Sequence, residues 1–157
     1  MRTLMLVIAI LAVSLPTSAN AQRRRMRARS APITEKPEIG GHIGYNFDAK
    51  HMFIGAQGTV PIAPQVDFYP SLDYYTISGA SEWSLNLDFK LRPPKAPRFY
   101  FGPGLNLFHA GGTHSHLNIF GGWESATGNL RPYVEARELI GSGSSFQITG
   151  GVNLVLH

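Results

Sequence analysis

Residues 81–91, with the sequence SEWSLNLDFKL, alternate between apolar and polar side chains without a break. Successive side chains of a β-strand point to opposite faces, so this period of two predicts a strand with two different surfaces. The apolar surface would carry Trp83, Leu85, Leu87, Phe89 and Leu91. The polar surface would carry Glu82, Ser84, Asn86, Asp88 and Lys90. Such a strand belongs at the boundary between an apolar and a polar environment.

The same period continues on both sides of this segment, from Ile39 to the end of the chain. Clusters of Gly, Pro, Asn and Ser interrupt it about every 12 to 16 residues, and each cluster predicts a turn. We therefore expect eight strands, at residues 38–48, 51–62, 65–75, 81–91, 98–108, 114–124, 130–140 and 145–156. Strands of about ten residues can cross a bilayer, and an even number of them closes a sheet without a free edge. The expected fold class is all-β, a single closed antiparallel up-and-down transmembrane barrel.

The first 37 residues follow a different pattern. Arg2 precedes an apolar run from Leu4 to Val13, and the sequence Ala19-Asn20-Ala21 provides the small residues that signal peptidase accepts. These features predict a cleaved signal peptide at residues 1–21, because the apolar run is too short to cross ~30 Å of hydrocarbon as a helix. Five arginines between positions 23 and 29 then predict a basic, disordered leader at residues 22–37. The barrel would occupy residues 38–157.

The composition narrows the possible functions. The net charge of +4 lies largely in the arginine-rich leader, so the remainder of the chain is close to neutral and we expect no nucleic-acid partner. The chain contains no Cys, which excludes disulfides, a lipid anchor on cysteine and a thiolate metal site. We also expect no cofactor.

The position of the aromatic residues indicates which face of the sheet is outside. If the first strand runs away from the periplasm, one set of outward aromatic residues lies near the upper rim: Tyr45, Phe47, Tyr74, Trp83 and Phe146. A second set lies near the lower rim: Phe68, Phe89, Phe99, Phe101 and Trp123. Two aromatic girdles on either side of an aliphatic belt are typical of a surface that faces lipid. The apolar side chains are therefore predicted to face outward.

The polar face would then be enclosed in the lumen. An eight-stranded barrel is only wide enough to be filled by side chains, and enclosed charges must be paired. We predict a structural network of the lumen residues Glu82, Asp88, Lys90, Glu135 and Arg137. Bulky side chains would fill much of the remaining space: Tyr69, Tyr75, Tyr100, Phe120 and Tyr133. No open pore is expected.

Three segments carry a resemblance to a known group: FYFGPGL at 99–105, RPYVEAR at 131–137 and ITGGVNL at 148–154. With the signal peptide and the eight alternating segments, the chain resembles the small eight-stranded outer-membrane β-barrel proteins of Gram-negative bacteria over about residues 39–156. The resemblance implies a location in the outer membrane, contact with outer-membrane lipid, insertion by the barrel-assembly machinery and a monomeric state. One departure is the last residue, His157, where members of the group commonly end on an aromatic residue.

Two other functions are compatible with parts of the pattern. A soluble periplasmic lipocalin-like barrel that binds an apolar ligand also has alternating strands, but its apolar face is inside. Outer-membrane lipid A deacylases are small barrels that use a His, a Ser and a Glu on the lipid-facing side, and here His114, Ser115, His116 and Glu124 are present. Adjacent residues such as His114 and Ser115 face opposite sides of a strand, whereas a nucleophilic Ser needs its base within ~3 Å. We therefore expect no enzyme.

His109, His114 and His116 lie in or beside one predicted upper loop. Two imidazoles can begin a metal site, but a stable site usually has three or four ligands. We expect no metal, and the sequence leaves open whether these histidines bind one. The expected function is that of a non-enzymatic integral outer-membrane protein with a structural, adhesive or small-partner-binding role.

Overall fold

The computed structural model describes residues 36–77, 80–141 and 144–157. The expected signal peptide at residues 1–21 and the expected leader up to residue 35 lie outside the described residues. Within the described part of the chain, no helix is long and apolar enough to span a bilayer.

The barrel contains eight strands: β1 Glu38–Asn46, β2 His51–Ala63, β3 Val66–Ile77, β4 Ala80–Leu91, β5 Phe99–His109, β6 Thr113–Glu124, β7 Leu130–Ile140 and β8 Ser145–Val155. Every strand begins and ends within two residues of its predicted bounds. The period of two predicted the strands well because each strand lies between two environments. The side chains of a strand therefore alternate in polarity along its whole length.

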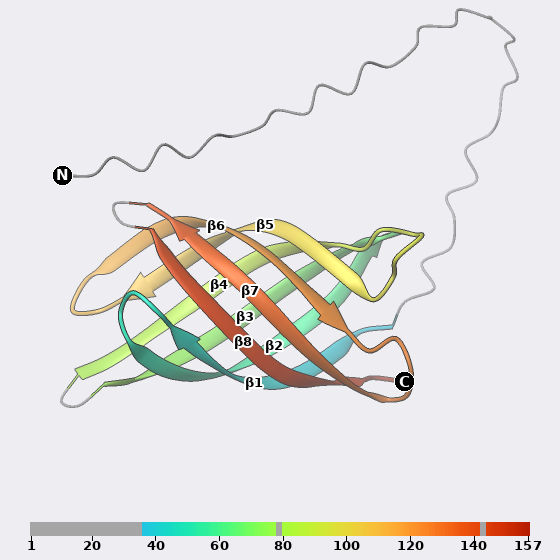
Figure 1. Cartoon of the computed structure of the whole chain (residues 1–157), viewed down its shortest axis with the longest axis horizontal. Coiled ribbons are helices and arrows are strands. Elements are labelled where there is room, and N and C mark those ends of the chain that lie inside the picture. Colours follow the sequence, from blue (N-terminus) through green and yellow to red (C-terminus); the bar gives the residue numbers. More distant parts are fainter. Residues whose placement is uncertain (1–35, 78–79, 142–143) are drawn as a thin grey trace, which may run out of the picture. The chain divides into compact units, whose positions relative to one another are not determined.

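Each strand pairs antiparallel with the next one along the chain, and β8 pairs with β1 to close the sheet (Figure 1). Ile43 of β1 illustrates the closure, because it lies opposite Ile54 of β2 and Gly150 of β8. The predicted fold class, a closed antiparallel up-and-down barrel of eight strands, is confirmed. We call the end where β1 begins and β8 ends the terminal end, on the right in Figure 1, and the opposite end the distal end.

The apolar side of each strand faces outward, as predicted. Ile54 and Ile119, in the middle of the outer surface, keep 56% and 54% of their surface exposed. On the inner surface, the exposed fraction of Asp88 and Lys90 is 0%. This arrangement is the reverse of a soluble protein, in which apolar side chains are buried and charged ones are in water.

The lumen is narrow, and its aromatic rings need space that the neighbouring strands provide. Four of the buried rings lie directly opposite a glycine: Phe53 opposite Gly44, Tyr100 opposite Gly122, Phe120 opposite Gly102 and Tyr133 opposite Gly151. A Cβ atom added to Gly122 would lie 2.6 Å from a ring carbon of Tyr100, which is too close for two carbon atoms. The absence of a side chain at these glycines therefore lets the rings lie flat against the opposite backbone.

Candidate functional site in the barrel lumen

The enclosed surface carries two groups of interacting polar side chains. The first group, the ion-pair cluster, extends from the terminal end to the middle of the barrel and contains Glu38, Asp67, Asp88, Lys90, Arg92, Glu124, Arg131, Glu135 and Arg137. The second group, the amide cluster, lies toward the distal end and contains His42, Ser71, Asp73, Ser84, Asn86 and Asn106. Both clusters follow from alternation, because every second residue of each strand points into the lumen.

Glu124, at the end of β6, accepts hydrogen bonds from two cations in the ion-pair cluster. The Nζ of Lys90 lies 3.4 Å from its Oε2, and the Nη2 of Arg92 lies 2.9 Å from the same oxygen. Arg92 also donates through Nε to Asp67 Oδ2 at 3.1 Å. Burial by itself would lower the pKa of Arg92, which follows the end of β4, but the carboxylates of Glu124 and Asp67 raise it above its ordinary value. Arg92 therefore stays charged and ties β3 to β6 across the mouth of the barrel.

Lys90 occupies an aromatic niche as well as an ion pair. Its Nζ lies 3.8 Å from the ring centroid of Tyr69 and 4.4 Å from that of Tyr100. Cation–π contacts of this kind are strongest when water is excluded, and Lys90 is fully buried. The two rings and Glu124 together compensate for the transfer of a lysine out of water.

Arg137 holds the middle of the lumen together. Its Nη2 lies 2.7 Å from Asp88 Oδ2 on β4 and 2.9 Å from Glu135 Oε1 on its own strand. Asn118 of β6 donates a further hydrogen bond to Asp88 at 3.0 Å, and the guanidinium of Arg137 lies 5.0 Å from the ring centroid of Phe120. One cation therefore serves two enclosed carboxylates.

Asp73 of β3 is the main acceptor of the amide cluster. Its Oδ1 lies 2.7 Å from His42 Nε2 on β1, and its Oδ2 accepts from Asn86 at 2.8 Å and from Ser84 at 3.2 Å. The side-chain oxygen of Asn86 in turn accepts from Asn106 at 2.7 Å. These contacts connect four strands, β1, β3, β4 and β5, mostly through neutral groups.

Further hydrogen bonds cross the lumen between strands that are not neighbours. Tyr133 of β7 donates to Gln57 of β2 at 2.6 Å, and Gln57 donates to Asn153 of β8 at 2.6 Å. Nearer the distal end, Gln147 of β8 donates to Tyr75 of β3 at 3.0 Å. The opposite walls are therefore fastened to each other at several heights.

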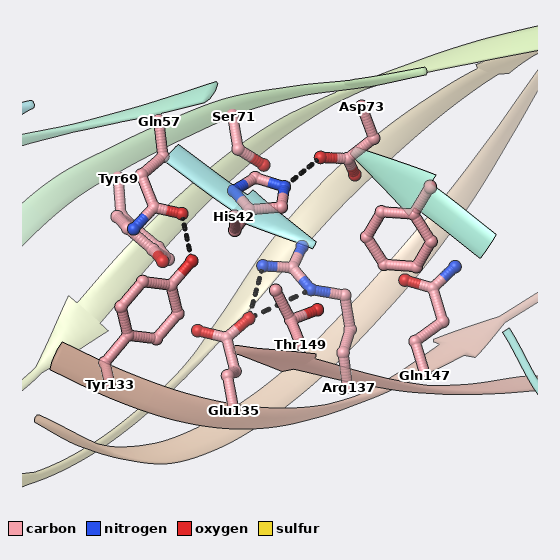
Figure 2. Close-up of a pocket in the computed structure, with 11 residues that line it drawn as sticks. His42, Gln57, Tyr69, Ser71, Asp73, Tyr133, Glu135, Arg137, Gln147 and Thr149 are labelled. Carbon is pink, nitrogen blue, oxygen red and sulfur yellow. Dashed lines mark hydrogen bonds and ion pairs between the residues drawn. The ribbon is translucent and has the colours of Figure 1, made fainter. Parts of the chain in front are cut away.

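Figure 2 shows the cavity that remains between these groups, with His42 and Asp73 above it and the Glu135–Arg137 pair below. Its volume is about 10 Å³, which is about the space that one water molecule needs. Every element of this site positions a polar group toward a polar group on another strand. The arrangement can hold the walls of the barrel together through polar contacts.

The predicted lumen network is placed as follows. Asp88, Lys90, Glu135 and Arg137 are buried, and all four belong to the ion-pair cluster. Glu82 is half-buried near the distal rim and forms no ion pair with any described residue. Alternation gave Glu82 the inner side of β4, but at that height the lumen opens toward solvent and the carboxylate needs no partner.

The ten aromatic residues predicted as girdles all lie on the outer face. At the distal end, Tyr74 lies opposite Trp83, and a cluster of three rings is formed by Tyr45, Phe47 and Phe146. At the terminal end, the outer rings are Phe68, Phe89, Phe99, Phe101 and Trp123, in which Phe68 pairs with Phe89 and Phe99 pairs with Trp123. The exposed belt between the two sets is mainly aliphatic.

The residues considered for metal binding and for lipid A hydrolysis are not brought together. His109 faces outward and stacks on Trp83 at 5.2 Å, whereas His116, opposite the inner residue Asn106, belongs to the inner side of β6 with His114. Ser115 faces outward, away from both of these histidines, and Glu124 lies buried at the other end of the barrel. Among the described residues, no group of three His, Cys, Asp or Glu side chains is placed to hold a metal ion.

Several members of the two clusters were missed by sequence reasoning. They are Glu38, His42, Asp67, Ser71, Asp73, Arg92 and Arg131. The signal for Asp67, Ser71 and Asp73 was present, because they alternate with apolar residues in step with the inner residue Tyr69. Arg92 and Arg131 stand beside prolines at strand ends, where alternation carries less information.

The sequence matches no family model and no curated protein. Its structure, however, is similar to several solved structures. The N-terminal β-barrel domain of Pseudomonas aeruginosa OprF superimposes with a TM-score of 0.62 at 15% identity, over 78% of this chain and 98% of that one. Neisserial surface protein A (NspA) gives a TM-score of 0.60 at 14% identity, over 76% of this chain and 97% of that one.

A third similar structure is a designed protein. The de novo designed TMB2.3 gives a TM-score of 0.59 at 12% identity, over 78% of this chain and 95% of that one. At these identities the likeness concerns the fold. The chain therefore has the fold of the small eight-stranded outer-membrane barrels, and the resemblance predicted from its sequence is confirmed.

Proposed function

We propose that the chain is an integral outer-membrane β-barrel protein with a closed lumen and a structural, adhesive or small-partner-binding role. The observation that carries this proposal is the distribution of side chains on the two faces. A continuous aliphatic belt lies outside between two sets of aromatic rings, and the charged side chains are enclosed. A lipid environment makes that distribution favourable, because in water the whole apolar belt would be in contact with solvent.

The orientation of the faces argues against the soluble lipocalin-like alternative. An apolar ligand in such a barrel needs an apolar interior, whereas this lumen contains ion pairs and amide hydrogen bonds. Ile54 and Leu72, which would have to line that interior, are among the most exposed apolar residues of the outer face.

A closed lumen is favoured over a diffusion pore. The Arg137–Asp88 pair and the Tyr133–Gln57 hydrogen bond span the lumen between strands that are not adjacent. With buried rings above and below them, the cavity in Figure 2 has room for a single water molecule.

The short connections at the distal end favour a structural or small-partner role over that of a receptor with a large surface. If the terminal end faces the periplasm, residues 47–50 and 110–112 are two of the extracellular turns. Loops of this length offer few side chains for a partner. The scattered positions of His114, Ser115 and Glu124 likewise favour a non-enzymatic protein.

Cell fractionation tests the membrane location. The protein is expected in the outer-membrane fraction, to require detergent for extraction, and to migrate faster on a gel before boiling than after it, because the folded barrel resists the detergent. Recovery in the soluble periplasmic fraction without detergent would exclude the proposal.

A pair of matched variants tests which surface contacts lipid. Ile119→Arg places a charge in the middle of the belt, where it should destabilise the barrel in vesicles by ~2–4 kcal/mol. Leu130→Arg makes the same change at the terminal rim, where the expected loss is ~0–1 kcal/mol. Equal losses at the two positions would contradict a lipid-facing belt.

A further inference from the structure

A cavity of about 350 Å³ lies at the terminal end of the barrel. Its lining comes from the start of the described chain, from the β4–β5 and β6–β7 connections, and from the adjoining strand ends. The lining residues that matter for its chemistry are Lys36, Arg92, Ser125, Asn129, Arg131 and His157. This cavity is separate from the lumen site and much larger than the space inside the lumen.

The Lys and Arg side chains of the lining have no Asp or Glu beside them in it. Lys36, Arg92 and Arg131 line the cavity, and among its described lining residues there is no Asp or Glu. Arg92 is held by Asp67 and Glu124, and the Nη1 of Arg131 lies 2.5 Å from Glu38 Oε1. These pairs fix the two guanidinium groups in place and leave Lys36 as the exposed cation of the cavity.

The charge around the cavity is also one-sided. Two further exposed cations, Lys95 and Arg98, belong to the β4–β5 connection at the same end. The described Asp and Glu side chains of this end, Glu38, Asp67 and Glu124, are buried and already engaged by Lys90, Arg92 and Arg131. Among the described side chains of the terminal end, the accessible charges of Lys and Arg are therefore not balanced by an accessible Asp or Glu.

The distal end has the opposite character. Its accessible charged groups among the described residues are three carboxylates, Asp48, Glu82 and Glu138, and one ammonium, Lys50. The accessible side-chain charge therefore differs in sign between the two ends, and the terminal end attracts an anion that approaches from its own side of the membrane. A hollow lined by one sign of charge concentrates this effect.

The rim of the cavity is built to stay in place. The carbonyl oxygen of Asn129 accepts a hydrogen bond from the backbone N–H of Val155 at 2.8 Å, which ties the β6–β7 connection to β8. Gly128 has a φ of +84°, a conformation that a residue with a side chain adopts only with strain, so the turn depends on glycine there. The backbone of this connection is therefore held in place at the edge of the cavity.

We propose that this cavity binds a small anionic group, a phosphate or a carboxylate, that arrives from the aqueous side of the terminal end. Arg131, Lys36 and the polar rim would provide charge-assisted hydrogen bonds to its oxygens. The lining comes from the chain connections and strand ends at the terminal end, and none of it belongs to the exposed aliphatic belt. The ligand is thus a soluble anion or the anionic end of a polymer, and not the headgroup of a lipid that surrounds the barrel.

Titration of the full chain, folded in detergent micelles and labelled with ¹⁵N, tests the site. Inorganic phosphate and acetate are added at constant ionic strength, with chloride as the reference anion. Saturable shifts of the amide signals of residues 125–131 are expected with phosphate or acetate. If chloride produces the same shifts, or if the shifts do not saturate, they report only non-specific screening of charge by salt. Either result would overturn the proposal.

Three variants assign the effect to the cavity. Asn129→Asp places a carboxylate among the cations and should weaken binding about tenfold or more, and Lys36→Gln should weaken it by about threefold. Lys50→Gln removes the same charge as Lys36→Gln but at the distal end. The affinity of this variant for phosphate should therefore equal that of the unmodified chain. Faster gel migration before boiling shows that each variant is folded. Equal effects of Lys36→Gln and Lys50→Gln would overturn the assignment.

Lipid nanodiscs distinguish the source of the anion. The chain is placed in phosphatidylcholine and in phosphatidylglycerol nanodiscs without added phosphate. The proposal expects the same amide positions for residues 125–131 in both lipids, and a later shift when phosphate is added. If phosphatidylglycerol produces the shift without added phosphate, the cavity binds a lipid headgroup. That result would exclude the proposed soluble anion as its ligand. If the chain binds no anion in micelles, the proposed anion site is excluded. The proposed membrane location is tested separately, by cell fractionation.

Discussion

Toward the terminal end the lumen is filled by charged side chains that neutralise each other, whereas toward the distal end it is filled mostly by amides and hydroxyls. In the first region one cation often serves two carboxylates, as Arg137 does for Asp88 and Glu135. In the second region one neutral side chain, Asn86, joins several partners by ordinary hydrogen bonds. The difference matters because an enclosed charge without its partner is far less favourable than an enclosed amide without one.

The comparison indicates that the two regions contribute differently to the protein. The ion-pair cluster is sensitive to loss of its shared members, since removal of Arg137, Arg92 or Glu124 leaves at least one enclosed charge without its ion-pair partner. The amide cluster can lose one contact and retain the others. The ion-pair cluster also adjoins the cavity at the terminal end, because the pairs Arg92–Glu124 and Arg131–Glu38 hold two of the residues that line it.

The largest expected effect follows from removal of the central cation. Arg137→Met fills similar space but leaves Asp88 and Glu135 enclosed without a counter-ion, so the free energy of unfolding should fall by about 3–5 kcal/mol. Urea unfolding in lipid vesicles, followed by tryptophan fluorescence, measures the change.

The control removes the charges together. The triple variant Asp88→Asn, Glu135→Gln and Arg137→Met carries no enclosed charge at this height, so it should regain most of the lost stability. If the single variant loses less than ~1 kcal/mol, the enclosed carboxylates do not depend on Arg137 and the comparison between the two regions fails.

A smaller effect is expected in the amide cluster. Asn86→Leu removes the donor to Ser71 and Asp73 and the acceptor for Asn106, at an expected loss of about 1–3 kcal/mol in the free energy of unfolding. Asn106→Leu removes only the bond to Asn86 and should lose less, about 1 kcal/mol. The same urea unfolding in vesicles measures both. A loss for Asn86→Leu as large as that for Arg137→Met would erase the distinction between the clusters.

Alternation accounts for the part of this architecture that was predictable. It placed the strands and separated the inner from the outer residues, because a strand between lipid-like and polar surroundings alternates at every step. It also placed Glu135 and Arg137 on one side of one strand, and they do form an ion pair.

The partners across the lumen were not predictable in the same way. Glu124 was considered beside His114 and Ser115 for catalysis, yet it pairs with Lys90 and Arg92. Alternation defines the face on which a residue lies but not its height relative to residues on other strands. That height depends on the stagger between strands around the closed barrel, which the pattern of a single strand does not contain.

The smallest expected effects concern two turns, one at each end of the barrel. Lys50 in the β1–β2 turn and Gln65 in the β2–β3 turn have φ values of +58° and +68°. A side chain in this conformation is unfavourable by ~1–2 kcal/mol, and glycine adopts it freely but loses ~0.5–1 kcal/mol more entropy on folding. Lys50→Gly and Gln65→Gly should therefore each stabilise the barrel by ~0.5–1 kcal/mol in the same unfolding measurement.

These two turns compare the ends of the barrel without the lumen. The backbone strain at Lys50 and Gln65 is local, and neither residue belongs to the ion-pair cluster or the amide cluster. Equal gains at the two ends would mean that the difference between the regions lies in the lumen chemistry alone. If Gln65→Gly raises the free energy of unfolding and Lys50→Gly does not, the turns at the two ends differ as well as the lumen. Ala49→Gly is the control: Ala49 is not one of the described residues with positive φ, so glycine should bring no gain there.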